Sequence, residues 1–339
     1  MLKFHTLVLT CFFASSYLAQ DAHFTQLDKT IAYLNPAMTG NFEGYAKITA
    51  QNRSQWINSG TSFTTSYLMG EMNFGKKKRG LNSFAGVGAY FLNDVGGASK
   101  IGLRTGGISA SGNVPFSRNQ WISGGINLSF NQRVIDLSNV TFLSQWDGTT
   151  INPGQSSGEN INFSNDLYPD AGMGVAFNFQ QSSDAAFNTK NFKFQGGISF
   201  QHLNRPKMNF TSIENDRMYV KTLIHASSSF GVTSVNNIEI TLAQFFQGPH
   251  KETVIGTFVK TKLKEASHFT SLISAQYLTI GSYFRSTMDL CPYFSLDLGP
   301  FKLGLAYDFN FRNITRESYR HSIEIQLAYQ FSKRNNLKF

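Results

Sequence analysis

Apolar and polar residues alternate most regularly near the C-terminal end of the chain. Between residues 321 and 331, isoleucine, leucine and aromatic side chains occupy every second position, and polar residues or alanine stand between them. The same alternation recurs over residues 301–311 and, with glycine among the small residues, over 169–180 and 191–203. A period of two is typical of a β-strand whose faces meet different surroundings. The pattern predicts strands that separate an apolar environment from a polar one.

The length of these segments indicates which apolar environment they meet. Several alternate for about 10 residues, near the ~9 to 11 that a tilted strand needs to cross a bilayer, whereas soluble strands usually have about 5 to 6. About fourteen such segments can be counted, an even number, as bacterial outer-membrane barrels have. The sequence therefore predicts an all-β fold, a transmembrane antiparallel β-barrel. Its strands are expected near residues 44–57, 61–74, 81–93, 99–113, 120–133, 169–180, 191–203, 218–231, 236–247, 252–262, 270–285, 289–297, 300–312 and 319–332.

The spacing of the strands predicts an orientation. The two longest gaps, residues 134–168 and 204–217, follow the fifth and seventh predicted strands. In an even-stranded barrel with both ends in the periplasm, connections after odd strands face outward, where barrels keep their long loops. We expect the barrel to comprise residues 44–339, preceded by a short periplasmic N-terminal segment, residues 20–43.

The first residues are typical of an export signal. Lys3 precedes an apolar run over residues 6–14 and the small residues Ser15 and Ser16. This order predicts a signal peptide, residues 1–19. Cys11 also permits a lipoprotein signal, but the residues before it fit that motif poorly. After removal of the signal, Cys291 is the only cysteine, so no intrachain disulfide is expected.

Composition agrees with a barrel and argues against other classes. Charged residues make up 15% of the chain and aromatic residues 14%, and the mean hydropathy is -0.21. No apolar run approaches the ~18 to 20 residues of a membrane helix. A membrane strand with one polar face has no such run, because its apolar and polar residues average to a moderate hydropathy. The formal charge of +9 includes a basic cluster, residues 76–79, between two glycines. Without interleaved aromatic residues the cluster predicts a solvated turn, and no nucleic-acid partner is expected.

No enzyme or metal site is expected. Residues 154–158 match the G-x-S-x-G motif of hydrolases, but they lie in a predicted outer loop with no helical pattern after them. The histidines stand singly, without the spacing of metal ligands. A lipolytic barrel would need serine and histidine on adjacent strands at the lipid boundary, and no residue recommends itself. We expect neither catalysis nor a cofactor.

Two acidic residues are predicted to face the lumen. Asp308 and Glu324 fall on the polar faces of neighbouring strands, with Lys302 and Arg320 in the same hairpin. They could form a charge network that fills the interior or a selectivity feature that lines a pore. The sequence leaves both open.

Three motifs resemble those of the PorP/SprF family. The first comprises residues 21–26 (DAHFTQ) and 33–40 (YLNPAMTG), and the second is residues 52–56 (NRSQW) at the end of the first predicted strand. The third is the closing hairpin, with residues 307–310 (YDFN) and 324–329 (EIQLAY). The family tail usually reads H-E-I, whereas here His321 is separated from Glu324, so no role is carried over to this histidine.

The resemblance implies a non-enzymatic outer-membrane barrel of the type IX secretion system that helps to export or anchor large surface proteins, such as gliding adhesins. Its implied partner is the C-terminal domain of a secreted adhesin or other large cargo, beside outer-membrane lipid. Periplasmic secretion-motor or peptidoglycan-linked proteins are further candidates. The alternative, from another class, is a general porin or small-molecule transporter, in which a basic open lumen would favour anions.

The family motifs supply the candidate site residues, as structural or docking residues. We hypothesise that a turn at Asn35, Pro36 and Gly40 tucks the N-terminal segment under or into the barrel. Trp56 fits either an interfacial aromatic anchor or part of a docking face. The full set is Asn35, Pro36, Gly40, Arg53, Gln55, Trp56, Asp308 and Glu324.

Overall fold

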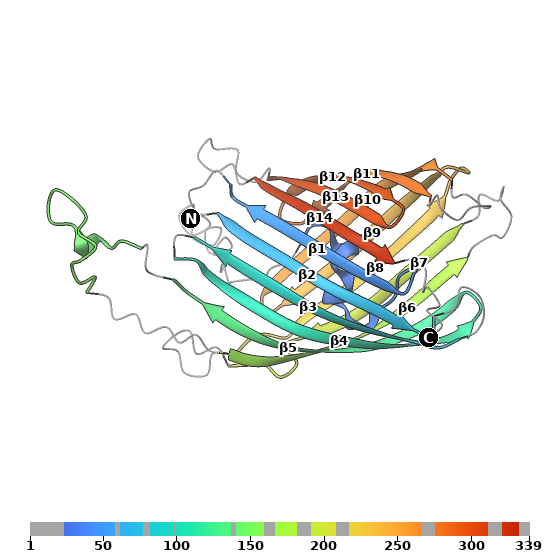
Figure 1. The fold of residues 1–339 in the computed structure, drawn as a ribbon, viewed down its shortest axis with the longest axis horizontal. Coiled ribbons are helices and arrows are strands. Elements are labelled where there is room, and N and C mark those ends of the chain that lie inside the picture. Colours follow the sequence, from blue (N-terminus) through green and yellow to red (C-terminus); the bar gives the residue numbers. More distant parts are fainter. Residues whose placement is uncertain are drawn as a thin grey trace, which may run out of the picture.

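A closed barrel forms most of the computed structural model. The structure describes residues 24–57, 62–76, 82–97, 99–136, 140–158, 167–181, 191–207, 217–265, 275–310 and 321–331. Within these ranges fourteen antiparallel strands form one sheet, and β1 pairs with both β2 and β14 (Figure 1). The strands are β1 Ala46–Gln55, β2 Phe63–Phe74, β3 Phe84–Gly96, β4 Ile101–Ser117, β5 Gln120–Val134, β6 Leu167–Gln181, β7 Phe192–Gln201, β8 Lys221–Gly231, β9 Asn236–Gln247, β10 His250–Lys264, β11 Gln276–Arg285, β12 Asp289–Leu298, β13 Phe301–Asn310 and β14 Ser322–Phe331. The predicted fold class is confirmed.

The strands form because each has one face for lipid and one for the lumen. In β14, Glu324 and Gln326 are each 1% exposed, whereas Ile325, which lies between them in the strand, is 42% exposed. The outward apolar side chains meet hydrocarbon, and the closed ladder pairs the backbone groups that lipid cannot. No helix among the described residues is long and apolar enough to cross a membrane.

The connections define the two ends of the barrel. The longest, residues 135–166 and 202–220, follow β5 and β7, as the sequence predicts. Since outer-membrane barrels carry long loops outside the cell, we call this the outer end. At the opposite, inner end, Ala46 begins β1 and Phe331 ends β14.

The chain's own N-terminal segment fills the lumen. Residues 24–40, which we call the plug, contain the helix α2, Leu27–Leu34, and the 3-10 helix η1, Pro36–Met38. Figure 1 shows α2 within the ring of strands. Apolar residues about one turn apart let α2 pack against inward side chains of β8 to β13, with Tyr283 fully buried there. The plug residues of this stripe are Leu27, Ile31 and Leu34.

The plug runs from the outer end to the inner end. Thr25 contacts Asp308 and Arg285, close to where β13 and β11 end on the outer side. Gly40 donates its backbone N–H to Glu71 Oε2 (3.0 Å), near the inner end of β2. Most of the described part of residues 20–43 therefore lies inside the barrel, and residues near Glu43 reach the inner end. The signal peptide, residues 1–19, lies outside the described residues, and it stays a prediction, as does the domain boundary at residue 44.

Close packing of the plug on β3 gives a first test. A Cβ atom on Gly86 would overlap the backbone oxygen of Thr39 and lie 2.7 Å from Ser111 Oγ. We expect Gly86→Val to destabilise the protein by about 1–3 kcal/mol and to displace the plug, measured by urea unfolding and by conductance in planar bilayers. The control is Gly112→Val on neighbouring β4, where a Cβ meets no atom within 4 Å. Equal effects of the two substitutions would contradict the plug contact.

Candidate functional site

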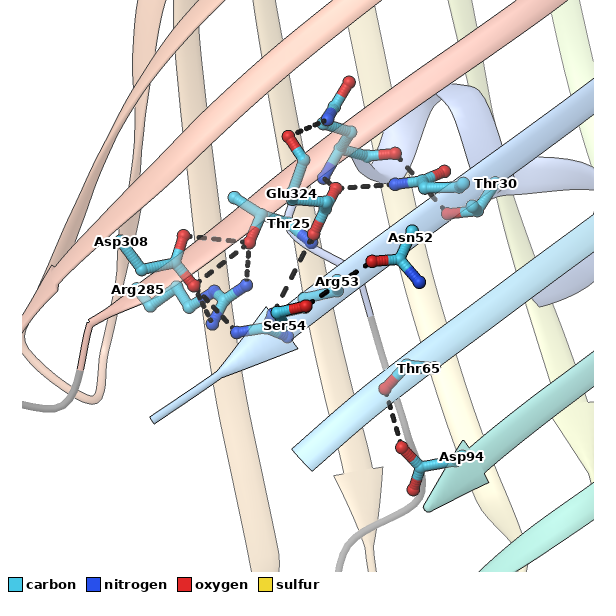
Figure 2. Close-up of polar contacts among 12 residues, drawn as sticks. Thr25, Thr30, Asn52, Arg53, Ser54, Thr65, Asp94, Arg285, Asp308 and Glu324 are labelled. Atoms are coloured by element: carbon cyan, nitrogen blue, oxygen red, sulfur yellow. Dashed lines mark hydrogen bonds and ion pairs between the residues drawn. The ribbon is translucent and has the colours of Figure 1, made fainter. Parts of the chain in front are cut away.

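A buried group of charges lies at the outer end of the lumen (Figure 2). Asp308 and Glu324 face the lumen, as the alternation predicts, and Arg53 of β1 lies between them. Arg53 Nη2 is 2.7 Å from Asp308 Oδ2, and its Nε is 3.9 Å from Glu324 Oε2. Closure of β1 against β14 brings these residues together, because Arg53 is the direct cross-strand neighbour of Glu324.

A second arginine completes the group. Arg285, the last residue of β11, lies 3.5 Å from Asp308 Oδ2 through Nη1 and 3.8 Å from Glu252 Oε1 through Nε. All five residues are at most 4% exposed. We call them the anchor cluster: Arg53, Glu252, Arg285, Asp308 and Glu324. Buried charges of this kind are tolerated when each is paired and hydrogen-bonded.

The anchor cluster holds the start of the plug. Glu324 accepts the backbone N–H of Thr25 (2.7 Å) and of Gln26 (2.9 Å), one on each carboxylate oxygen. The Thr25 hydroxyl donates to Asp308 Oδ1 (3.1 Å) and accepts from Arg285. Gln51 donates to the same Glu324 carboxylate (2.5 Å). The acids predicted to line the lumen therefore bind the polypeptide that fills it.

The predicted partners of these acids differ from the observed ones. Lys302 is the second residue of β13 and lies toward the inner end, far along the strand from Asp308. Arg320 lies outside the described residues. Arg285 and Glu252 escaped the sequence reasoning because β10 and β11 are not in the closing hairpin. Both residues occupy inward-facing positions in the alternation of their strands, and this alternation is the signal that could have identified them.

The remaining motif residues of the N-terminal segment shape the middle and the end of the plug. The Asn35 side chain caps η1 by accepting the Ala37 N–H (3.0 Å), and its Nδ2 lies 2.9 Å from His225 Nε2. Pro36 occupies the first position of η1, where its missing N–H costs nothing. Gly40 has φ +73°, and a Cβ there would lie 2.7 Å from Gly86 Cα. The hypothesis of a turn that tucks this segment into the barrel agrees with this geometry.

Gln55 and Trp56 lie beside the anchor cluster, at the outer end of β1. Gln55 ends the strand, paired in register with Phe63 and Ser322. The Trp56 ring packs edge-on against Phe63 with 4.9 Å between centroids, and the backbone N–H of Trp56 donates to the His321 carbonyl. This half-buried position at the strand end fits an aromatic anchor at the membrane interface.

A small polar cavity lies between the plug and the bases of the long outer connections. The buried pair His202 and Asp170, 2.8 Å apart, forms one wall, and Tyr33 of the plug forms another. It has room for about one or two water molecules. Asn131 Nδ2 in its lining has no hydrogen-bond partner among the described residues. An ordered water fits this site.

The connection between β5 and β6 carries a small folded arm, residues 142–158 (Figure 1, green, projecting beyond the barrel). It contains the 3-10 helix η2, Leu143–Gln145, and a bridge between Trp146 and Ile151. Backbone N–H groups of Thr150 and Thr149 lower the pKa of Asp147 to about 2, so its carboxylate stays ionised and fixes the turn. The arm exposes Leu143 (91%), Trp146 (50%) and Ile151 (47%).

The arm also contains the serine motif, without the geometry of a nucleophile elbow. Ser156 lies in irregular backbone, and the described residues that follow it, 157 and 158, are not helical. Among the described residues no three His, Cys, Asp or Glu side chains gather as they would around a metal ion.

Comparisons with known proteins agree with the fold. The family model described as "Type IX secretion system membrane protein PorP/SprF" matches residues 16–329. No curated protein matches the chain. Among solved structures, the Ralstonia pickettii toluene transporter TbuX is similar, with 11% identity, a TM-score of 0.50, and coverage of 88% of this chain and 93% of TbuX. A Pseudomonas aeruginosa FadL homologue has 8% identity, a TM-score of 0.48 and coverage of 89% and 94%. At 11% identity the likeness to TbuX concerns the fold alone.

The anchor cluster predicts a large effect of a single substitution. Arg53→Met leaves two buried carboxylates short of a positive charge, so we expect it to lower the free energy of unfolding by about 3–5 kcal/mol. The measurement is urea unfolding of the barrel in lipid vesicles. The matched control is Lys193→Met, whose partner Glu43 lies 3.2 Å away with both side chains at least half exposed. There we expect at most about 1 kcal/mol. A loss at Arg53 as small as the control's would contradict the anchoring role.

Proposed function

Because the chain belongs to the type IX secretion system membrane protein PorP/SprF family, we propose that this outer-membrane barrel helps to export or anchor a large secreted surface protein. In this proposal it binds the C-terminal domain of that protein, a gliding-adhesin-like cargo, and performs no catalysis. The membership and the barrel fold are those of a secretion-system protein rather than of a typical enzyme.

The plug is the observation that carries the proposal. The plug and the inward side chains around it are largely buried, so the described lumen is occupied by the chain itself. A folded domain cannot share that space. The cargo therefore binds outside the lumen, and the outer end offers the long connections for it.

The arm is the part of the outer end best suited to bind a protein. Leu143, Trp146 and Ile151 present apolar surface to water, held by a turn and a backbone bridge. Tryptophan is enriched at the energetic centres of protein interfaces, and an ordered loop loses little conformational entropy on binding. These residues form the proposed contact with the cargo.

The plug weighs against the alternative of a general porin or small-molecule transporter. A diffusion channel needs a continuous aqueous path, whereas the plug crosses the lumen and is bound at both ends, through Thr25 at the outer end and Gly40 at the inner end. We give the cargo-binding function precedence for this reason.

Affinity purification tests the proposal directly. The tagged barrel is purified from detergent-solubilised outer membranes, and co-purifying proteins are identified by mass spectrometry. We expect a very large secreted protein, retained through its C-terminal domain, and we expect that protein to be missing from the surface or released after gene deletion. A normal surface proteome after deletion would falsify the proposal.

Substitutions in the arm locate the contact. The double variant Leu143→Ser with Trp146→Ser removes exposed apolar area, so we expect at least about tenfold less cargo in the purification. The control is Val235→Ser, an apolar residue about as exposed (46%) as Trp146 (50%), in the inner turn between β8 and β9. Both variants should fold, as judged by heat-modifiable migration in gels. Unchanged recovery with the arm variant would place the contact elsewhere.

A further inference from the structure

A row of polar residues crosses the lipid-facing side of the barrel near its outer end. Cross-strand pairing joins one residue from each of the five adjacent strands β1 to β5. In strand order they are Asn52, Ser66, Asn93, Arg104 and Gln132, which we call the polar row. Their neighbours in sequence, such as Arg53 and Thr65, are buried in the lumen, so the polar row faces outward.

The polar row interrupts an apolar surface. At its two ends Asn52 pairs with Ile325 of β14, and Gln132 pairs with Leu167 of β6. The next outward-facing row toward the inner end contains only apolar residues and glycine, namely Ala50, Leu68, Phe91, Gly106 and Phe130. A polar group on the lipid-facing surface costs free energy unless it meets polar partners. The polar row therefore indicates that polar groups from outside the chain contact this part of the barrel.

Arg104 gives the polar row a positive charge. Its Nε donates to Asn93 Oδ1 (3.3 Å), and Asn52 Nδ2 donates to Ser66 Oγ (2.9 Å). Among the described residues, no carboxylate lies within 4 Å of the Arg104 guanidinium, which is exposed on this face. A guanidinium binds phosphate through two parallel N–H groups, and amides and hydroxyls form hydrogen bonds with sugar hydroxyls. The polar row thus has the chemistry of a site for a phosphorylated sugar.

A notch in the apolar surface lies next to Arg104, on the side toward the inner end. Gly106, two residues further along β4, faces outward, and a Cβ built on it meets no atom within 4 Å. Its cross-strand neighbours Phe91 and Phe130 are 50% and 61% exposed, so an aromatic side chain flanks the open position on each side. A narrow apolar notch of this kind fits a hydrocarbon chain. From the outer end inward, the surface therefore changes from charged to apolar in the same order as a lipid headgroup and its chain.

We propose that the polar row and the notch bind a phosphorylated glycolipid of the outer leaflet, such as lipid A. Arg104 binds a headgroup phosphate, the other residues of the polar row bind the sugar, and one acyl chain lies in the notch. The occupant is a membrane lipid because these side chains face away from the lumen at the outer end, where the glycolipid phosphates of the outer leaflet are the anions within reach. The proposal is independent of the cargo contact, which is proposed for the arm.

Binding of lipid A to the full mature barrel in detergent tests the proposal. The probe is diphosphorylated lipid A, counted on the protein by native mass spectrometry, and the reference is the same lipid without its phosphates. We expect the phosphorylated lipid to bind more tightly, and Arg104→Gln to weaken its binding by at least about fivefold, since a single basic residue contributes this much at an anionic lipid surface. The control Arg118→Gln removes an exposed arginine in the inner turn between β4 and β5 and should change the affinity by less than about twofold.

Further variants separate the headgroup, the acyl chain and folding. Arg104→Lys keeps the charge and should keep most of the binding, which covers the case of a poorly folding glutamine variant. Gly106→Phe fills the notch and should weaken binding by at least about threefold. Gly124→Phe, at an equally open lipid-facing position near the inner end of β5, should not. Equal losses with Arg104→Gln and Arg118→Gln, equal binding of the dephosphorylated lipid, or displacement of the lipid by an equal concentration of inorganic phosphate would each overturn the proposal.

Discussion

A closed barrel of fourteen strands is too wide for its own inward side chains to fill. Barrels of about eight strands pack their interiors with side chains, and those of about sixteen leave an aqueous channel. Here the inward residues are mostly small or polar, such as Ser109, Ser123 and Thr105. Closing such a lumen requires additional polypeptide, and the N-terminal segment supplies it. The positions of the anchor cluster, of the capped η1 and of Gly40 all follow from that requirement.

Filling the lumen with peptide creates a second physical problem, because backbone N–H groups and charged side chains then become buried together. Two arginines and three acids at the outer end solve it by pairing, with Glu324 also taking two backbone N–H groups. The arrangement gives the plug a specific attachment rather than a purely apolar fit. At the inner end Lys47 pairs with Glu71, and Lys260 pairs with Asp297.

The strands could be predicted from the sequence because alternation reports a local property of each segment. Residues 236–247 match β9 at both ends, and β5 differs by one residue. The inward position of Asp308 and Glu324 follows from the same alternation of inward-facing and outward-facing residues. Their partners could not be predicted, since Arg53 and Arg285 reach them only through closure of β1 on β14 and through β11. The sequence also did not predict helix α2. Leu27, Ile31 and Leu34 have helical spacing, but a pattern of eight residues is too short to identify a helix.

The bonds between Glu324 and residues 25–26 join positions nearly 300 apart in the chain. Contacts of such separation form late, because the entropy of closing the intervening loop must be overcome first. Strand β14 is the last to be synthesised, and its pairing with β1 closes the ring. The same carboxylate that holds the first described residues therefore lies on the strand that completes the barrel. Attachment of the N-terminal segment is therefore coupled energetically to closure of the barrel, because Glu324 contributes to both.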